Sequence, residues 1–153
     1  MNTVYVMVGV PGSGKSTWIA NQNWSNDCAI VSTDTHVEAY AKASGKTYSE
    51  VFEEYMPHAI GLMLEDVVAA REAGKDIIWD QTSTSIKTRA NKIRMLPNYY
   101  KIAVVFRKPG DKELKRRLAS RPGKDVPWSV IQQMWSNWED PTKEEGFDEI
   151  WYV

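Results

Sequence analysis

The sequence predicts an α/β fold in which helices cover both faces of a parallel β-sheet, and two observations lead to it. First, five short apolar runs alternate with segments of helical periodicity along the 153 residues. Continuous apolar strands between helices are typical of a parallel sheet that is buried on both faces. Second, the first run leads directly into a glycine-rich loop of the phosphate-binding type. The length fits one domain, 1–153, with a single core.

The strands are expected at the apolar runs, and the helices between them carry start and stop signals. A capping box at 47–50 predicts a helix that Gly74 ends, with Pro57 expected to kink or restart it. Ser85 is a plausible N-cap for a helix that reaches about residue 95. The expected strands are 4–8, 29–31, 77–79, 102–106 and 150–153.

The loop at 9–16 reads Gly-Val-Pro-Gly-Ser-Gly-Lys-Ser, which matches the pattern G-x-x-x-x-G-K-[ST]. Its glycines allow the backbone N–H groups to approach a triphosphate closely, Lys15 can reach the terminal phosphates, and the Ser16 hydroxyl can ligate Mg²⁺. The sequence therefore predicts a nucleoside triphosphate as the first ligand. The residues expected to hold it are Gly12, Ser13, Gly14, Lys15, Ser16 and Thr17.

Two aspartates follow predicted strands and are candidates for chemistry at the carboxyl edge of the sheet. Asp34 ends I-V-S-T-D and could accept the proton of an attacking hydroxyl group. The segment 35–38 is a capping box that would place Asp34 one residue outside the next helix. Asp80 ends D-I-I-W-D and fits an acid that acts near Mg²⁺ or organises the acceptor site. The alternatives are a helix-start aspartate and a turn-forming aspartate.

A basic segment near 112–124 is predicted to supply a lid over the phosphates, at about 117–126. Arginines delivered by a closing lid stabilise the charge of a phosphoryl group in transfer and exclude water. We expect Arg121 in that role, with Arg117 as a second phosphate contact. The other basic residues of the helix are expected to form a solvated face, as most charge runs do.

Bulk properties narrow the classes of function. The formal net charge of −1 gives no overall attraction to nucleic acid or to an anionic membrane. No apolar stretch approaches the ~20 residues that span a bilayer, and the lone Cys28 excludes an internal disulfide, so a soluble cytoplasmic protein is expected. The segment 91–94 lacks the acidic position of a GTP-reading motif, and motor ATPases need a longer chain. A small phosphotransferase fits the length best.

The histidines and several tryptophans fit structural roles. His36 and His58 lack the spacing of a zinc site. Trp18, Trp128, Trp135 and Trp138 are expected in the core or in contacts between subunits rather than as stacking platforms. The aromatic density near the C-terminus would permit a homo-oligomer.

The chain resembles the phage-type polynucleotide 5′-hydroxyl kinases, within a wider group of small P-loop kinases that includes zeta-toxin-like phosphotransferases. The resemblance rests on the loop followed by Thr17-Trp18, on Ser32-Thr33-Asp34, on Asp80-Gln81-Thr82-Ser83, and on the spacing of Glu113, Arg117, Arg121, Lys124, Val126, Val130 and Met134. It implies ATP and Mg²⁺ as ligands, Asp34 as general base, Arg117 and Arg121 as lid arginines, and the 5′-hydroxyl end of DNA or RNA as acceptor.

The chain departs from that family's pattern at the acceptor site. Val37 stands where the phage enzyme has an arginine that is used at the acceptor phosphate, and His36 lies beside it. The acceptor-side residues expected from the resemblance are therefore Asp34, His36, Asp80 and Thr82. The chain has no D-x-D-x-T signature, so a 3′-phosphatase activity is not expected. Two alternatives stay open: a kinase for a small hydroxyl compound (a nucleoside, nucleotide or sugar), and a non-catalytic ATP-binding module.

Overall fold

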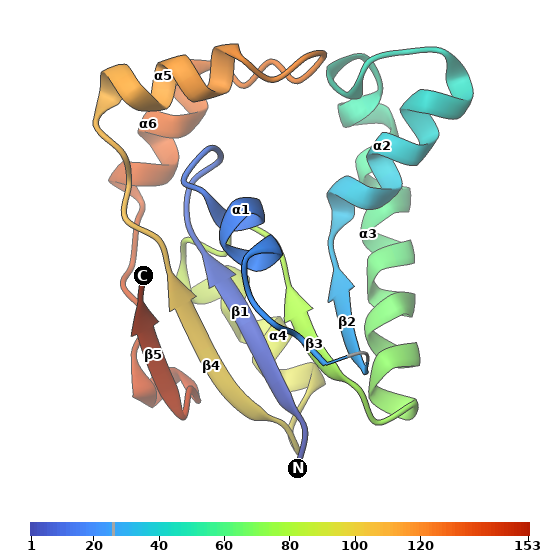
Figure 1. Cartoon of the computed structure of the whole chain (residues 1–153), viewed down its shortest axis with the longest axis vertical. Coiled ribbons are helices and arrows are strands. Elements are labelled where there is room, and N and C mark those ends of the chain that lie inside the picture. Colours follow the sequence, from blue (N-terminus) through green and yellow to red (C-terminus); the bar gives the residue numbers. More distant parts are fainter. Residues whose placement is uncertain (26) are drawn as a thin grey trace.

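A computed structural model describes residues 1–25 and 27–153 of the chain. Figure 1 shows a β-sheet with helices on both faces and a helical arm rising above each side of it. In chain order the elements are β1 (Thr3–Val8), α1 (Lys15–Ala20), β2 (Cys28–Val31), α2 (Thr33–Ser44), α3 (Tyr48–Glu72), β3 (Asp76–Trp79), α4 (Ile86–Met95), β4 (Tyr100–Val105), α5 (Asp111–Ala119), α6 (Trp128–Ser136), a 3₁₀ turn (Lys143–Glu145) and β5 (Glu149–Tyr152).

The five strands form one parallel sheet in the order β2-β3-β1-β4-β5, which confirms the predicted fold class and places β1 at the centre. Val6 of β1 lies opposite Trp79 of β3 on one side and Ala103 of β4 on the other. Each strand falls within a residue or two of its predicted run. Because all strands are parallel, their carboxyl ends meet at one edge, where the phosphate-binding loop leaves β1.

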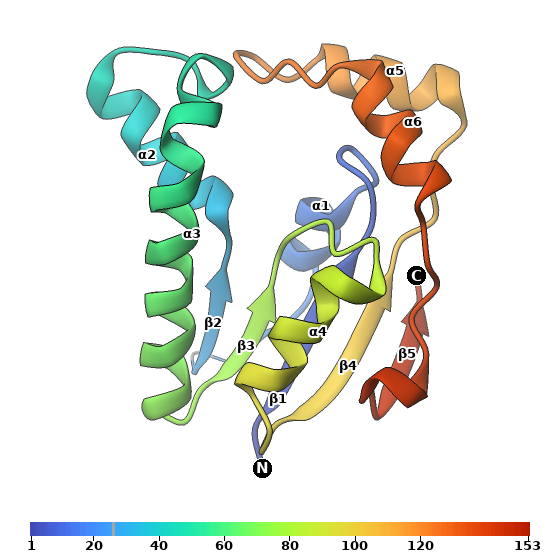
Figure 2. The same ribbon diagram turned by 180° about the vertical axis from the view of Figure 1, so that it is seen from behind.

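Side chains of β1 point alternately to the two faces of the sheet, and each face has its own part of the core. Val4, Val6 and Val8 pack on the face that α3 and the end of α4 cover, whereas Met7 packs on the face that α1 covers. Figures 1 and 2 show α1 and α4 on opposite faces. Trp18 joins the α1 side, with its ring centroid 5.8 Å from that of Phe106.

Helix starts agree with the sequence signals in two cases and differ in one. Thr47 and Ser85 are the N-caps of α3 and α4, as predicted. Both helices start with complete capping boxes, of which the one at Thr47 was predicted. The start of α2 was predicted wrongly: Ser32 is its N-cap, and its Oγ accepts a hydrogen bond from the N–H of Asp34 at 3.1 Å. Asp34 thus lies in the first turn of α2. Pro57 sits inside α3, which runs unbroken over 25 residues, so the predicted restart was also wrong.

Helices α5 and α6 and the connection between them lie over the carboxyl ends of the strands. Leu114, Leu118 and Ile131 of α5 and α6 pack on Val10 of the phosphate-binding loop, and Trp128 and Trp138 pack beside them. Residues 120–127 join α5 to α6 as a long loop. Both views show its tip extending toward the turn between α2 and α3. None of the helices in the described part of the chain has the length and apolar character needed to cross a membrane.

Candidate active site

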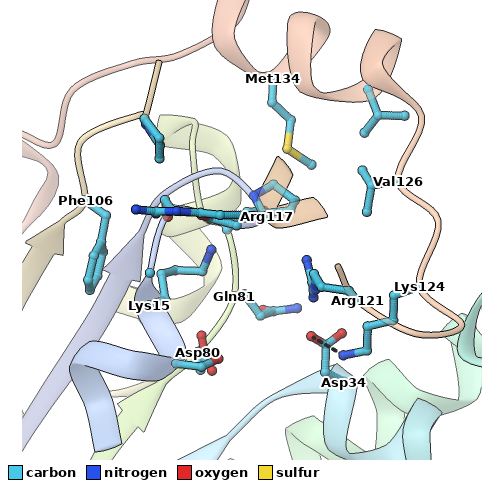
Figure 3. Close-up of a pocket in the computed structure, with 18 of the residues that line it drawn as sticks. Lys15, Asp34, Asp80, Gln81, Phe106, Arg117, Arg121, Lys124, Val126 and Met134 are labelled. Carbon is cyan, nitrogen blue, oxygen red and sulfur yellow. Dashed lines mark hydrogen bonds and ion pairs between the residues drawn. The ribbon is translucent and has the colours of Figure 1, made fainter. Parts of the chain in front are cut away.

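A cleft of about 1460 Å³ opens at the carboxyl edge of the sheet, under the connection between α5 and α6. Its lining comes from the phosphate-binding loop, the ends of β2 and β3, the start of α3 and the 117–127 segment. Figure 3 shows Lys15, Asp34 and Asp80 on its floor, with Arg117 and Arg121 above them. The structure therefore brings the main predicted site residues into one cleft.

The phosphate-binding loop has the backbone geometry that a triphosphate needs. Gly12 and Gly14 adopt positive φ angles of 80° and 99°, a conformation that side-chain-bearing residues rarely adopt. Within the described residues, the backbone N–H groups of Gly14, Lys15, Ser16 and Thr17 have no acceptor, and no side chain caps α1. A Cβ at Gly14 would meet no atom within 4 Å, so space is open beside these donors. The loop thus fits a phosphate group.

Lys15 is half-buried in the loop, and carbonyl oxygens hold its ammonium group. Its Nζ donates to the carbonyl oxygens of Gly9 and Val10, each at 3.0 Å. Burial lowers the pKa of Lys15 to about 8, although the nearby carboxylates of Asp80 and Asp34 act in the opposite direction. A bound anion would supply the counter-charge that this ammonium group lacks.

Asp80 and Thr82 lie in the loop that follows β3, next to the phosphate-binding loop. Burial raises the pKa of Asp80, and the charge of Lys15 partly offsets that effect. The Asp80 N–H donates to the carbonyl oxygen of Val31 at 2.9 Å, which ties the ends of β2 and β3 together. The carbonyl oxygen of Thr82 accepts from the N–H of Gly9, also at 2.9 Å. This loop therefore sets the position of the phosphate-binding loop.

A buried arginine holds the same loop from the opposite side. Arg89 of α4 has no exposed surface and forms a two-point ion pair with Glu145, with N–O distances of 2.8 and 3.1 Å. Its Nη1 also donates to the carbonyl oxygen of Ser83 at 2.9 Å. Ser83 is the one non-glycine residue with a positive φ among the described residues, and its φ is 45°. The Arg89 contact stabilises this strained turn beside Asp80.

Asp34 faces the cleft from the first turn of α2, and two residues contact it. The Tyr48 hydroxyl donates to Asp34 Oδ1 at 2.5 Å. Lys124 Nζ lies 4.0 Å from Asp34 Oδ2 and also pairs with Glu38. The Asp34 side chain remains 47% exposed, so a ligand in the cleft can reach it.

Arg117 and Arg121, the two arginines predicted to lie in a lid, differ in their contacts. Arg117 donates from Nη1 to the carbonyl oxygen of Gly12 at 3.1 Å and from Nε to Glu113 at 2.9 Å. Arg121 lines the cleft and has no side-chain hydrogen bond or ion pair with any described residue. Its guanidinium group is thus available to a ligand.

The structure does not bring His36 into this group. His36 Nε2 lies 2.6 Å from Asp66 Oδ2 of α3, and His36 is absent from the cleft lining. Its neighbour Val37 is fully buried between α2 and α3. Neither position offers a cation to the cleft.

Tyr48 and Phe52 are among the cleft residues that the sequence did not mark as site residues. Tyr48 follows the N-cap of α3, and Phe52 is 40% exposed one turn later, with the two ring centroids 5.5 Å apart. In the sequence Tyr48 reads as part of the capping box at 47–50, and Phe52 reads as a member of the apolar helix face that follows it. Only the pairing of α2 with α3 brings them beside Asp34, and no local pattern encodes that pairing.

Comparison with curated proteins finds relatives in two mammals. Two curated relatives are heterogeneous nuclear ribonucleoprotein U-like protein 2 of Mus musculus and of Homo sapiens, at 27% and 26% identity over 159 positions. The alignments cover 97% of this chain but 21% of each relative, so the chain spans about a fifth of their length.

Two solved structures share the fold. A candidate kinase from Chloroflexus aurantiacus J-10-fl superposes with a TM-score of 0.70 at 18% identity, covering 99% of this chain and 84% of the other. A chain of the PezAT chromosomal toxin–antitoxin system of Streptococcus pneumoniae gives 0.63 at 15% identity, covering 100% and 68%. A family profile described as "AAA domain" matches residues 4–141. By this match the chain belongs to the AAA domain family, and its architecture is that of a small P-loop kinase-like domain.

Proposed function

We propose that this protein transfers the γ-phosphate of ATP to the 5′-hydroxyl end of a nucleic acid. The observation that carries the proposal is the meeting of three groups in one cleft: Lys15 of the phosphate-binding loop, the half-exposed carboxylate of Asp34, and the guanidinium group of Arg121, which pairs with no described residue. These are the parts that phosphoryl transfer to a hydroxyl group requires.

In the proposed reaction the acceptor oxygen attacks the γ-phosphorus, and the bond between that phosphorus and the oxygen leaving with ADP breaks. Asp34 accepts the proton of the acceptor hydroxyl. Arg121 stabilises the charge on the phosphoryl oxygens, and Lys15 with the loop N–H groups holds the β- and γ-phosphates.

Mg²⁺ would be held by the Ser16 hydroxyl together with phosphate oxygens and water, and would neutralise phosphate charge. This donor set fits a magnesium–nucleotide complex, because Mg²⁺ in such sites needs few protein ligands. The free N–H groups of Gly14 to Thr17 provide the matching phosphate cradle.

Two observations support an acceptor that carries a nucleobase. The cleft wall on α3 presents Tyr48, Phe52 and Met56 at intervals of one helical turn, and Phe52 is partly exposed there. An exposed aromatic ring offers a stacking surface that a simple sugar does not need. The curated relatives are named as ribonucleoproteins, which favours a nucleic-acid acceptor over other hydroxyl compounds.

A second candidate is a kinase for a small hydroxyl acceptor such as a nucleoside. Burial of Val37 favours it, since the family resemblance expects an arginine for the acceptor phosphate at that position. The cleft wall formed by α2 and α3 also has no cation among its described lining residues. An acceptor bound there would be recognised with few phosphate contacts.

The test is transfer of labelled γ-phosphate from ATP with Mg²⁺ to a single-stranded oligonucleotide with a 5′-hydroxyl end. The same oligonucleotide with a 5′-phosphate, and the variant Lys15→Ala, are the controls. Label on the hydroxyl end alone, lost in Lys15→Ala, supports the proposal.

The salt response separates the two candidates. Affinity for a polynucleotide that engages several phosphates falls steeply with ionic strength, whereas affinity for a neutral nucleoside does not. Transfer to free nucleosides but not to oligonucleotides would favour the second candidate. Absence of transfer to every hydroxyl acceptor, with ATP bound, would contradict both.

A further inference from the structure

Tyr48 is the first residue of α3, and its side chain joins the proposed general base to the lid. Its hydroxyl donates to Asp34 Oδ1 at 2.5 Å, across 14 residues of chain. Burial, followed by the hydrogen bond to Asp34, raises the pKa of Tyr48 well above its ordinary value. The phenol therefore stays protonated and remains a donor over the whole working pH range.

The ring of Tyr48 also contacts the lid through Lys124. Lys124 Nζ lies 4.6 Å from the centroid of the Tyr48 ring and 4.0 Å from Asp34 Oδ2. A cation over an aromatic face is attracted by the negative face of the ring. Figure 3 shows Lys124 extending from the lid toward Asp34.

Backbone contacts fix the lid beside this tyrosine. The Ser49 N–H donates to the carbonyl oxygen of Gly123 at 3.0 Å, and the Asp125 N–H donates to Ser49 Oγ at 2.7 Å. A Cβ on Gly123 would lie 3.1 Å from Thr47 Cβ, so the two segments are in close contact. The start of α3 is thus the surface on which the lid docks.

The hydrogen bond leaves one oxygen of Asp34 available for the acceptor. Oδ1 is occupied by the Tyr48 proton, whereas Oδ2 has no hydrogen-bond donor among the described residues and has Lys124 at the limit of ion-pair distance. A charge-assisted hydrogen bond to one oxygen fixes the plane of a carboxylate that is otherwise half exposed. Oδ2 is then held in a fixed orientation toward the cleft.

We infer that Tyr48 is a positioning residue, which orients Asp34 for proton transfer and couples that orientation to docking of the lid through Lys124. The inference rests on the proposed function, because it assumes that Asp34 is the general base. It goes further by assigning a role to Tyr48, which the proposed reaction steps do not use.

The first experiment compares Tyr48→Phe with Tyr40→Phe. Phenylalanine keeps the ring that contacts Lys124 and Phe52 and removes only the hydroxyl donor. Tyr40 stacks on Tyr55 with centroids 4.0 Å apart, and its hydroxyl donates to no described residue, so it controls for loss of a hydroxyl group on the same helix pair. We expect Tyr48→Phe to lower kcat roughly ten- to a hundredfold, with KM for ATP and acceptor unchanged.

A double variant separates positioning from general packing. If Tyr48 acts through Asp34, then Asp34→Asn and the double variant Asp34→Asn/Tyr48→Phe have the same reduced kcat. Losses that multiply in the double variant would overturn the inference. A Tyr48→Phe enzyme with full kcat beside an impaired Asp34→Asn enzyme would overturn it while leaving the proposed function intact. Full activity of Asp34→Asn would instead contradict the base assigned under the proposed function, and the inference with it.

Limited trypsin digestion tests the proposed coupling between Tyr48 and lid docking, and it does not depend on an activity assay. In the loop between α5 and α6, trypsin can cut after Lys124 but not after Arg121, because Arg121 precedes Pro122. The Lys124 side chain is only 18% exposed in the docked lid, so cleavage after it requires the lid to open. We expect cleavage there to be several-fold faster in Tyr48→Ala than in wild type, and unchanged in Tyr48→Phe, which retains the ring. Equal cleavage of Tyr48→Ala and wild type would show that the lid docks independently of Tyr48 and would overturn the coupling.

Discussion

Arg117 of α5 donates a hydrogen bond from Nη1 to the carbonyl oxygen of Gly12, 105 residues earlier in the chain, at 3.1 Å. The contact joins the lid helix to the loop that would hold the phosphates. Glu113 accepts from the Nε of the same arginine at 2.9 Å and fixes its orientation. The position of the lid and the shape of the phosphate-binding loop are therefore linked through one side chain.

This link predicts that Arg117→Ala weakens ATP binding more than Arg116→Ala. Both arginines pair with Glu113, but only Arg117 reaches Gly12. We expect roughly a tenfold increase in the Kd for ATP in Arg117→Ala, since a hydrogen bond from a charged donor to the loop is lost. Isothermal titration of ATP into both variants measures it. Equal affinities would mean that the Gly12 contact does not shape the loop.

The lowered pKa of Lys15 predicts that ATP binding takes up protons in mildly alkaline solution. Burial holds the pKa of Lys15 at about 8 in the free protein, and phosphate oxygens would favour the charged form and raise it. At pH 8.5 we expect uptake of roughly half a proton or more per ATP bound, and little uptake at pH 7, where Lys15 is already charged. ATP affinity should accordingly fall as the pH rises above about 8.

Calorimetry in two buffers of different ionisation enthalpy measures this uptake. Lys15→Arg is the matched control, because an arginine keeps its charge throughout this range and has no proton to gain. Uptake that persists in Lys15→Arg would assign the proton to another group.

The ion pair between Arg89 and Glu145 predicts a large loss of stability when one partner becomes neutral. Arg89 is fully buried and the Glu145 side chain is 6% exposed, so Glu145→Gln leaves a buried positive charge without its counter-charge. We expect the free energy of unfolding to fall by about 3–5 kcal/mol. Urea denaturation measures it, with Asp111→Asn as a control that breaks an exposed ion pair and leaves the midpoint unchanged. Arg89 also donates to two carbonyl oxygens, that of Ser83 from Nη1 and that of Glu139 from Nη2, each at 2.9 Å. A small effect of Glu145→Gln would mean that these two carbonyl oxygens suffice to hold Arg89.

The strands, two of the three long helix starts and the phosphate-binding loop were predictable because their signals are local. Runs of apolar residues, the capping box at Thr47, the N-cap at Ser85 and the G-x-x-x-x-G-K-S pattern each lie within a few residues of the element that they specify. The meeting of Asp34 with Lys15 was predictable too, because the carboxyl ends of parallel strands share one edge.

Contacts that depend on how α2 meets α3 could not be predicted. The bonds from Tyr48 to Asp34 and from His36 to Asp66 join residues that are 14 and 30 positions apart. The start of α2 was misjudged because Ser32 and Thr35 both fit an N-cap, and local sequence does not decide between them. Val37 is buried because it lies on the face of α2 that packs on α3, with Val51 and Ala59 in the same cluster.

Replacement of Gly12 and of Gly61 by alanine is predicted to change the free energy of unfolding in opposite directions. Gly12 has a φ of +80°, and a Cβ there would lie 2.9 Å from Leu114 Cδ1, so Gly12→Ala combines backbone strain with a clash against a fully buried leucine. We expect a loss of about 1–3 kcal/mol in the free energy of unfolding. Gly61 lies inside α3 with no atom within 4 Å of its Cβ position, so Gly61→Ala should gain about 0.4–1 kcal/mol by restricting the unfolded chain.

Urea unfolding of both variants measures the two changes on the same scale. ATP binding supplies a second readout, because the clash at Gly12 pushes α5 away from the phosphate-binding loop, whereas Gly61 is remote from the cleft lining. We therefore expect Gly12→Ala to weaken ATP binding and Gly61→Ala to leave it unchanged. If Gly12→Ala bound ATP with wild-type affinity, close packing of Leu114 and Leu118 on the loop would not be a condition for phosphate binding.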